Sequence, residues 1–308
     1  TLALQIAYKA LGISEENREV KPEAITTPFT FVATASSLKW EGVKPVFSDI
    51  DPKTWCLDPE KIEAAITPDT RAIVPVHVFG NACDVEAIDD IASKHDLKVV
   101  YDASHAFGVN YQGESLLKYG DAATLSFHAT KLFHTIEGGA IVFKRKEDLE
   151  RAKHMISFGL VGPETIDGPG INAKMNEFQA AMGLCVLDEM PANLSARRQA
   201  VAHYKQHLPT ALQQQASNSL ATANHAYMPV VLNSEDQVLE LLMRLRQKEI
   251  VARRYFYPSL DMCGFSWDVE MTVSRDIASR IICLPLYVGL SAAELNNITG
   301  IIKEVVAA

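Results

Sequence analysis

Short apolar segments alternate with helical segments through the first half of this 308-residue chain. The apolar segments are rich in β-branched residues, which is typical of strands that are covered on both faces of a sheet. Helical patterns lie between them, for example at 59–66 and 85–95, each preceded by an aspartate that can cap the helix. This alternation predicts an α/β domain around a largely parallel sheet. The predicted strands are 44–48, 72–76, 98–101, 123–126 and 140–143.

The pattern changes after about residue 172, where apolar residues begin to recur at helical spacing and continue into a long helix through Tyr204. Further elements follow, and a Gln-, Ala-, Ser- and Asn-rich stretch at 213–224 is expected to be an exposed loop. We therefore predict a large domain at residues 1–190 and a smaller α+β domain at residues 191–308. The later predicted elements are strands at 226–232 and 281–284 and helices at 235–247 and 292–306.

Composition excludes several classes of protein. The net charge is −9 and no basic run occurs, which argues against nucleic acid or an acidic membrane surface as a partner. No apolar stretch approaches the roughly 20 residues that a membrane span needs. Five scattered cysteines form no CxxC pair, which favours reduced thiols and a cytoplasmic protein.

Polar groups follow two of the predicted strands. Asp102 comes directly after 98–101, and the run 126–131 begins with Ser126 and ends with Lys131. Parallel sheets bind ligands beyond the carboxyl ends of their strands. A lysine amine can form an imine with the aldehyde of pyridoxal phosphate (PLP), and a carboxylate can keep the cofactor's ring nitrogen protonated. Because the Ser126 hydroxyl can also reach a phosphate, the run predicts a PLP enzyme.

Each of these residues also has a simpler interpretation. Lys131 alone could be a solvated surface lysine, and Asp102 could cap the turn that follows its strand. His105 could be a hydrogen-bonded core histidine, and Ser126 a turn hydroxyl. Their order and their common position at strand ends favour a site over these separate explanations.

Two other classes of site fit the sequence less well. A metal hydrolase would need a known zinc-ligand spacing, which the available side chains lack, so no metal is expected. A nicotinamide dehydrogenase would need GxGxxG after a strand, and the chain contains no such motif. The side chains considered for a metal were His77, Asp102, His105 and His128.

Seven ordered segments, spread over essentially the whole chain, resemble the DegT/DnrJ/StrS nucleotide-sugar aminotransferases. This resemblance implies the PLP-dependent transferase fold type I. That fold has a large domain with a mostly parallel seven-stranded sheet between helices and a smaller C-terminal α+β domain. The segments are 28–34, 42–49, 102–108, 126–131, 137–139, 172–181 and 282–286.

The resemblance also implies a role for each matching residue. Lys131 would hold PLP through an imine and carry the proton between cofactor and substrate. Asp102 would pair with the pyridine nitrogen, and His105 would hydrogen-bond the ring oxygen. Phe31 would stack on the cofactor ring, with a core phenylalanine as the alternative interpretation.

The cofactor phosphate would be held by three further side chains. Ser126 and Thr1 would contact it within the chain. Asn172 would reach the phosphate of the neighbouring subunit, so that a homodimer shares the active site.

The function implied by the resemblance is transfer of an amino group from L-glutamate to a nucleotide-linked keto sugar. The substrate would be dTDP-4-keto-6-deoxyglucose, aminated at C4, in the synthesis of cell-surface polysaccharides or natural-product sugars. Amination at C3, or a non-catalytic regulatory or scaffold relative, are the alternatives. Lys131 argues against the dehydratase branch, which carries histidine there.

The chain departs from the family's pattern in three places. Ile136 and Lys174 replace the usual glycine and arginine, and neither change removes a catalytic group. The family's segment before Thr1 is absent from the sequence. We therefore expect this chain to be a truncated version of a longer protein that binds PLP more weakly than the longer form.

Overall fold

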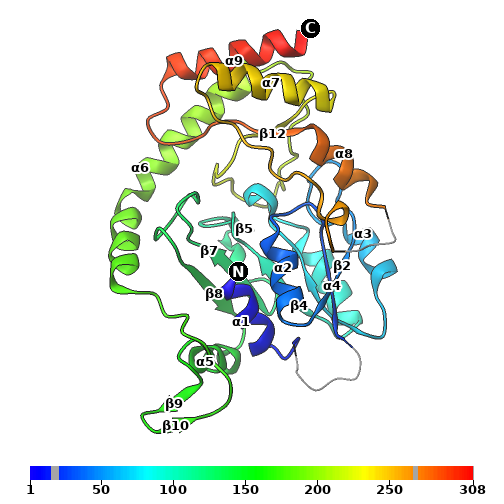
Figure 1. Ribbon diagram of the computed structural model, residues 1–308, viewed down its shortest axis with the longest axis vertical. Coiled ribbons are helices and arrows are strands. Elements are labelled where there is room, and N and C mark those ends of the chain that lie inside the picture. Colours follow the sequence, from blue (N-terminus) through cyan, green and yellow to red (C-terminus); the bar gives the residue numbers. More distant parts are fainter. Residues whose placement is uncertain (15–20, 266–269, 308) are drawn as a thin grey trace.

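The computed structural model describes residues 1–14, 21–265 and 270–307, and its centre is a sheet with helices on both faces (Figure 1). The strands are β1 Glu23–Thr26, β2 Lys44–Phe47, β3 Thr70–Val74, β4 Lys98–Asp102, β5 Asn110–Tyr111, β6 Glu114–Ser115, β7 Ala122–Ser126, β8 Gly139–Phe143, β9 Leu160–Gly162, β10 Thr165–Ile166, β11 Pro229–Val231 and β12 Ile281–Cys283. The helices are α1 Leu2–Ala10, α2 Ala33–Trp40, α3 Pro59–Ile62, α4 Val85–Lys94, α5 Lys146–Met155, α6 Glu177–His207, α7 Glu235–Gln247, α8 Thr272–Arg280 and α9 Ala292–Ala307.

The central sheet has the order β2-β1-β3-β4-β7-β8. Its strands pair in parallel except for β8, which runs antiparallel to β7. The predicted α/β fold with a mostly parallel sheet is therefore confirmed. The sheet has six strands in the described ranges, where the resemblance implies seven, and β5 and β6 form a separate pair.

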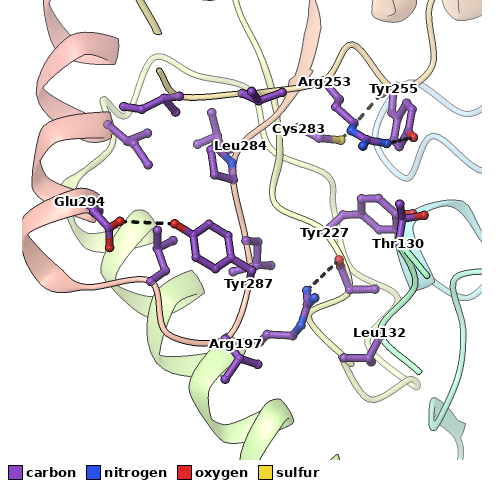
Figure 2. A pocket seen from close by; sticks show the side chains of 18 of the residues that line it. Thr130, Leu132, Arg197, Tyr227, Arg253, Tyr255, Cys283, Leu284, Tyr287 and Glu294 are labelled. Carbon is purple, nitrogen blue, oxygen red and sulfur yellow. Dashed lines mark hydrogen bonds between the residues drawn. The ribbon is translucent and has the colours of Figure 1, made fainter. Parts of the chain in front are cut away.

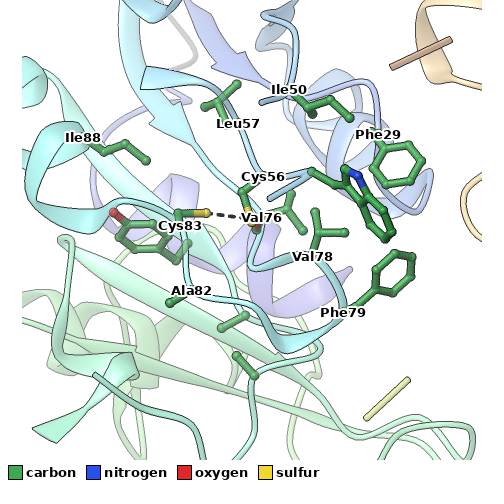
Figure 3. Packing of buried hydrophobic residues seen from close by; sticks show 14 of the residues in the cluster. Phe29, Ile50, Cys56, Leu57, Val76, Val78, Phe79, Ala82, Cys83 and Ile88 are labelled. Atoms are coloured by element: carbon green, nitrogen blue, oxygen red, sulfur yellow. Dashed lines mark hydrogen bonds between the residues drawn. The ribbon is translucent and has the colours of Figure 1, made fainter. Parts of the chain in front are cut away.

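Successive strand residues point to opposite faces of the sheet, so each face has its own core. Ala24 and Val100 pack with α1 on one face. Their neighbours Ile25 and Val99 pack on the other face with Ile88 of α4. This second core also holds Phe29, Phe79 and the fully buried Trp55, and Figure 3 shows part of it.

A second body is built from α7, α8, α9 and the antiparallel pair β11 and β12. Its core gathers Leu241, Ile282 and Ile302 with Tyr204 near the end of α6. The 31-residue α6 begins with a capping box between Asn176 and Gln179 and runs from beside the sheet to this second body (Figure 1). The predicted boundary at residue 190 falls inside α6, and the division into domains stays a prediction.

Two expectations need correction. The sequence analysis missed β1, which is only four residues long and is buried on both faces, so it carries no alternating pattern. The stretch 213–224 is irregular, but it is not wholly exposed. The buried Asn224 donates from its amide to the backbone oxygens of His105 at 2.8 Å and Phe107 at 3.0 Å, which fixes the segment against the sheet.

No helix in the described ranges is long and apolar enough to span a bilayer.

Candidate active site

The candidate site lies where β4 and β7 end side by side. Asp102, the last residue of β4, is paired in register with Thr124 of β7. β7 ends at Ser126, and the chain then forms a loop that carries Lys131 and returns at Gly139, which pairs with Ser126. A side chain at Gly139 would meet the backbone oxygen of Leu125 at 2.7 Å, so only glycine lets β8 approach this closely.

The carboxylate of Asp102 is buried and held from both sides. Its Oδ2 accepts a hydrogen bond from the Thr34 hydroxyl at 2.8 Å, and Oδ1 accepts from the hydroxyl of Ser104 at 2.6 Å and from its backbone N–H at 3.1 Å. Thr34 lies in the first turn of α2 and Ser104 just after β4. These bonds fix the orientation of an acidic group at the strand end.

The Lys131 amine lies in the electrostatic field of that carboxylate. Burial lowers the pKa of Lys131, while the charge of Asp102 works in the opposite direction. Lys131 Nζ donates to the phenol oxygen of Tyr227 at 3.4 Å. Sequence reasoning missed Tyr227, because it belongs to a segment far along the chain with no motif of its own.

His105 is buried beneath the same tyrosine. Its ring lies 4.7 Å from the Tyr227 ring and stacks parallel to Phe79 and Phe256. Nδ1 accepts a hydrogen bond from the Phe79 N–H at 3.1 Å, so a neutral ring carries its proton on Nε2. Burial and, second, the charge of Lys131 lower the pKa of His105 well below its usual value. His105 is therefore a neutral hydrogen-bond donor through Nε2.

A cavity of about 490 Å³ opens between β7, β8 and the start of α1, and we call it the polar cavity after the Thr1, Ser126 and Asn172 side chains among its otherwise largely apolar lining. Ser126 and Thr1 line it together with Asn172, which accepts a hydrogen bond from Lys174 at 2.7 Å. The positive end of α1 meets this space, and such helix ends favour anions. All three residues predicted to hold the phosphate thus line one cavity within one chain, while the reach of Asn172 to a second subunit stays a prediction.

Phe31 is not a core residue, which removes the alternative interpretation of this side chain. It lies two residues before α2 and is 53% exposed. Together with Thr1 it lines an apolar cavity of about 620 Å³. A flat hydrophobic ring is therefore available close to the polar cavity.

Lys131 lines a third and larger cavity, a cleft of about 800 Å³. Figure 2 shows other residues that line this cleft. One wall is the loop that carries Lys131, and the other comes from α6 and from segments next to α7, β12 and α9. Tyr227, Arg197 and Arg253 project into this cleft. Its volume lies in the range of small-molecule sites.

The chemistry of these residues fits PLP. A desolvated amine can bind an aldehyde, and the fixed Asp102 carboxylate can pair with a protonated ring nitrogen. The Nε2–H of His105 has no acceptor in the described part of the chain and can donate to a ring oxygen. No three His, Cys, Asp or Glu side chains among the described residues gather as a metal site requires.

The fold and this arrangement define a PLP-dependent transferase of fold type I. A model of the DegT/DnrJ/EryC1/StrS aminotransferase family matches residues 1–303. The chain belongs to that family, and its enzymes are PLP-dependent aminotransferases.

Individual relatives support this placement. A dTDP-4-amino-4,6-dideoxy-D-glucose transaminase of Shigella dysenteriae is 44% identical, over 99% of this chain and 83% of that protein. An Escherichia coli enzyme with the same name is 35% identical, over 97% and 82%. The crystal structure of DesI with its TDP-sugar product has a TM-score of 0.88 at 30% identity, covering 98% of this chain and 78% of that one.

Proposed function

We propose that this enzyme transfers the amino group of L-glutamate to C4 of dTDP-4-keto-6-deoxyglucose, in the synthesis of sugars for cell-surface polysaccharides or natural products. One observation carries the proposal. The Lys131 amine lines a cleft of about 800 Å³, burial lowers its pKa, and it lies in the electrostatic field of Asp102. The names of the Shigella dysenteriae and Escherichia coli relatives support the sugar and the ring position.

Each end of the cofactor would have its own set of residues. Asp102 would pair with the ring nitrogen, the Nε2–H of His105 would donate to the ring oxygen, and Phe31 would cover one face of the ring. The phosphate would be held by Thr1, Ser126 and Asn172. When bound, PLP supplies an electron sink for the carbon that loses its proton.

The chain's own residues would manage that proton. Because burial favours the neutral amine, Lys131 Nζ can accept a proton from the substrate carbon and deliver it to the cofactor. Burial also raises the pKa of Tyr227, so its phenol stays protonated and keeps the amine in place by the 3.4 Å hydrogen bond. The closed aromatic packing around His105 keeps water from this side of the site.

The enzyme would act as a homodimer in the cytoplasm. Large apolar side chains are exposed on the first half of α6 and on the segment that precedes it, among them Phe178, Leu184 and Ile171. Exposed apolar surface of this extent is typical of an interface, and a second copy of the chain would cover it. All five cysteines carry free thiols, which supports a reducing compartment.

The test is Lys131→Ala. The variant should fold normally by circular dichroism, yet lose the visible absorbance of the PLP-loaded enzyme and the transamination of dTDP-4-keto-6-deoxyglucose. Without the amine there is no covalent link and no proton carrier. Lys118→Ala is the matched control, because Lys118 pairs with Glu114 on the surface at 2.7 Å. Wild-type turnover in the Lys131 variant would end the proposal.

A further inference from the structure

Arg253 is a cation of the large cleft, and none of the described acidic side chains pairs with it. It follows α7, is exposed, and lines the cleft with its guanidinium (Figure 2). In the described part of the chain its side chain bonds no carboxylate, and its hydrogen bond goes to the phenol oxygen of Tyr255 at 2.6 Å. The adjacent Arg254 differs, because it pairs with Glu235 at 2.7 Å and also bonds the Ser279 oxygen at 2.8 Å.

The position of Arg253 is fixed by its backbone. Its N–H donates to the Cys283 oxygen at 3.2 Å, and the Cys283 N–H donates back at 2.8 Å, which ties the residue to the end of β12. The phenol of Tyr255 then holds the guanidinium from the side. A flexible side chain is thus preorganised, which reduces the entropy lost when it binds a ligand.

A path of contacts connects Arg253 to Lys131. The ring of Tyr255 meets the ring of Tyr227 edge-on at 6.1 Å, and the Tyr227 phenol accepts the hydrogen bond from Lys131. Arg253 therefore lies two aromatic side chains away from the amine, on the opposite wall of the cleft.

The cleft as a whole favours anions, although the chain carries a net charge of −9. Apart from Lys131, whose amine is reserved for the cofactor, three basic and two acidic side chains of the described residues line it. One of the acids, Glu294, is already engaged by Ser291 at 2.6 Å and by Tyr287 at 3.4 Å. These charged lining residues are Arg197, Lys248, Glu249, Arg253 and Glu294.

We propose that Arg253, held by Tyr255, binds the diphosphate of the nucleotide-linked sugar. This assignment rests on the proposed function. The carboxylate of an amino-acid donor is attached to the reacting carbon itself and must lie next to Lys131. The diphosphate of a 4-keto sugar is attached at C1, across the ring from the reacting C4, so it needs a cation at a distance from Lys131. The forked guanidinium suits phosphate oxygens.

The two half-reactions of the PLP-loaded enzyme test this directly. In Arg253→Gln, kcat/KM for dTDP-4-keto-6-deoxyglucose should fall about thirtyfold, the size expected for lost hydrogen bonds to a charged group. The rate at which L-glutamate bleaches the visible absorbance should change less than about twofold. Arg253→Lys should lie between, since it keeps the charge but loses the fork. Arg246→Gln is the control, because Arg246 is exposed on α7 outside the cleft.

Other outcomes would overturn the assignment. Equal slowing of both half-reactions would make Arg253 part of the donor's carboxylate site, and no slowing of either would leave it without a role in binding. If the wild-type enzyme aminates no nucleotide sugar, the proposed function fails. Calorimetry with dTDP then still tests whether Arg253 binds the diphosphate. Arg253→Gln should bind dTDP about tenfold more weakly than the wild type, and equal affinity would refute the assignment.

Discussion

The amine of Lys131 is subject to two opposing effects. Burial lowers its pKa, and the negative charge of Asp102 raises it. Because Thr34 and Ser104 hold the Asp102 carboxylate, its distance from the amine cannot relax freely. Asp102 therefore affects two partners: it serves the cofactor ring in the proposed function, and it also limits how far burial lowers the pKa of the lysine.

Asp102→Asn should separate these two effects. Removing the negative charge should lower the pKa of Lys131 further, so in the PLP-free protein the amine should be acylated at lower pH than in the wild type. The same variant should turn over at least about tenfold more slowly, because an amide cannot keep the ring nitrogen protonated. Peptide mass spectrometry across pH measures the first effect, with Lys118 as internal reference. An unchanged pH profile for Lys131 would show that the two groups do not interact.

Sequence patterns at this scale identify residues near one another in the chain. Asp102, His105, Ser126 and Lys131 follow strands of one sheet, so strand order alone predicts that they meet. Tyr227 reaches Lys131 across 96 positions in the sequence. No local pattern encodes that contact, and only the folded chain reveals it.

Among the elements, the first half of α6 carries large apolar side chains that the described part of the chain leaves uncovered. Phe178 is 87% exposed and Leu184 67% exposed, although both occur on a regular helix. Asn172, which lines the polar cavity, lies just before this helix. A second copy packed on this surface would therefore sit close to the proposed phosphate site.

Leu184→Glu should disrupt the proposed dimer, because a charge buried in an apolar interface is costly. Analytical ultracentrifugation should show a dimer for the wild type and a shift to monomer for the variant. Leu239→Glu is the control, since Leu239 is 51% exposed on α7, in the second body. A wild-type monomer at micromolar concentration, or a dimer that tolerates the charge, would contradict the prediction.

Long elements with clear periodicity are predictable from the sequence, and short ones are not. The helix α7 has the predicted bounds 235–247, because a serine cap and a strong apolar stripe mark it. The strand β1 has four buried residues and no period to read. The segment 213–224 looks like a surface loop by composition, yet Asn224 is buried because its amide satisfies two backbone carbonyls.

At the scale of the whole molecule, stability depends on groups that must stay neutral inside the cores. His77 is fully buried after β3, and its ring stacks on Tyr101 at 4.6 Å. Its Nδ1 accepts the Cys83 N–H at 3.1 Å. Burial lowers the pKa of His77 to about 3.

The unfolding free energy should therefore fall as the pH drops below the pKa of an ordinary histidine, about 6.5. The unfolded chain binds a proton at His77 near pH 6.5 while the folded chain does not, so the loss from pH 7 to 5 is about 2 kcal/mol. Urea unfolding of His77→Gln should show a flatter pH dependence by that amount, although His105 retains a similar effect. His154→Gln is the control, and an equal slope in wild type and His77→Gln would refute the prediction.

The helix α6 carries residues that line both the polar cavity and the cleft. Its 31 residues span on the order of 46 Å. Gln179 near its start lines the polar cavity, Arg197 lines the cleft, and Tyr204 near its end bonds the Pro285 oxygen at 2.9 Å. Pro191 lies between Gln179 and Arg197. As a proline it removes one backbone hydrogen bond from the helix at that position. Because one continuous helix carries lining residues of both cavities, the wall of the cleft at Arg197 and the wall of the polar cavity at Gln179 belong to the same element.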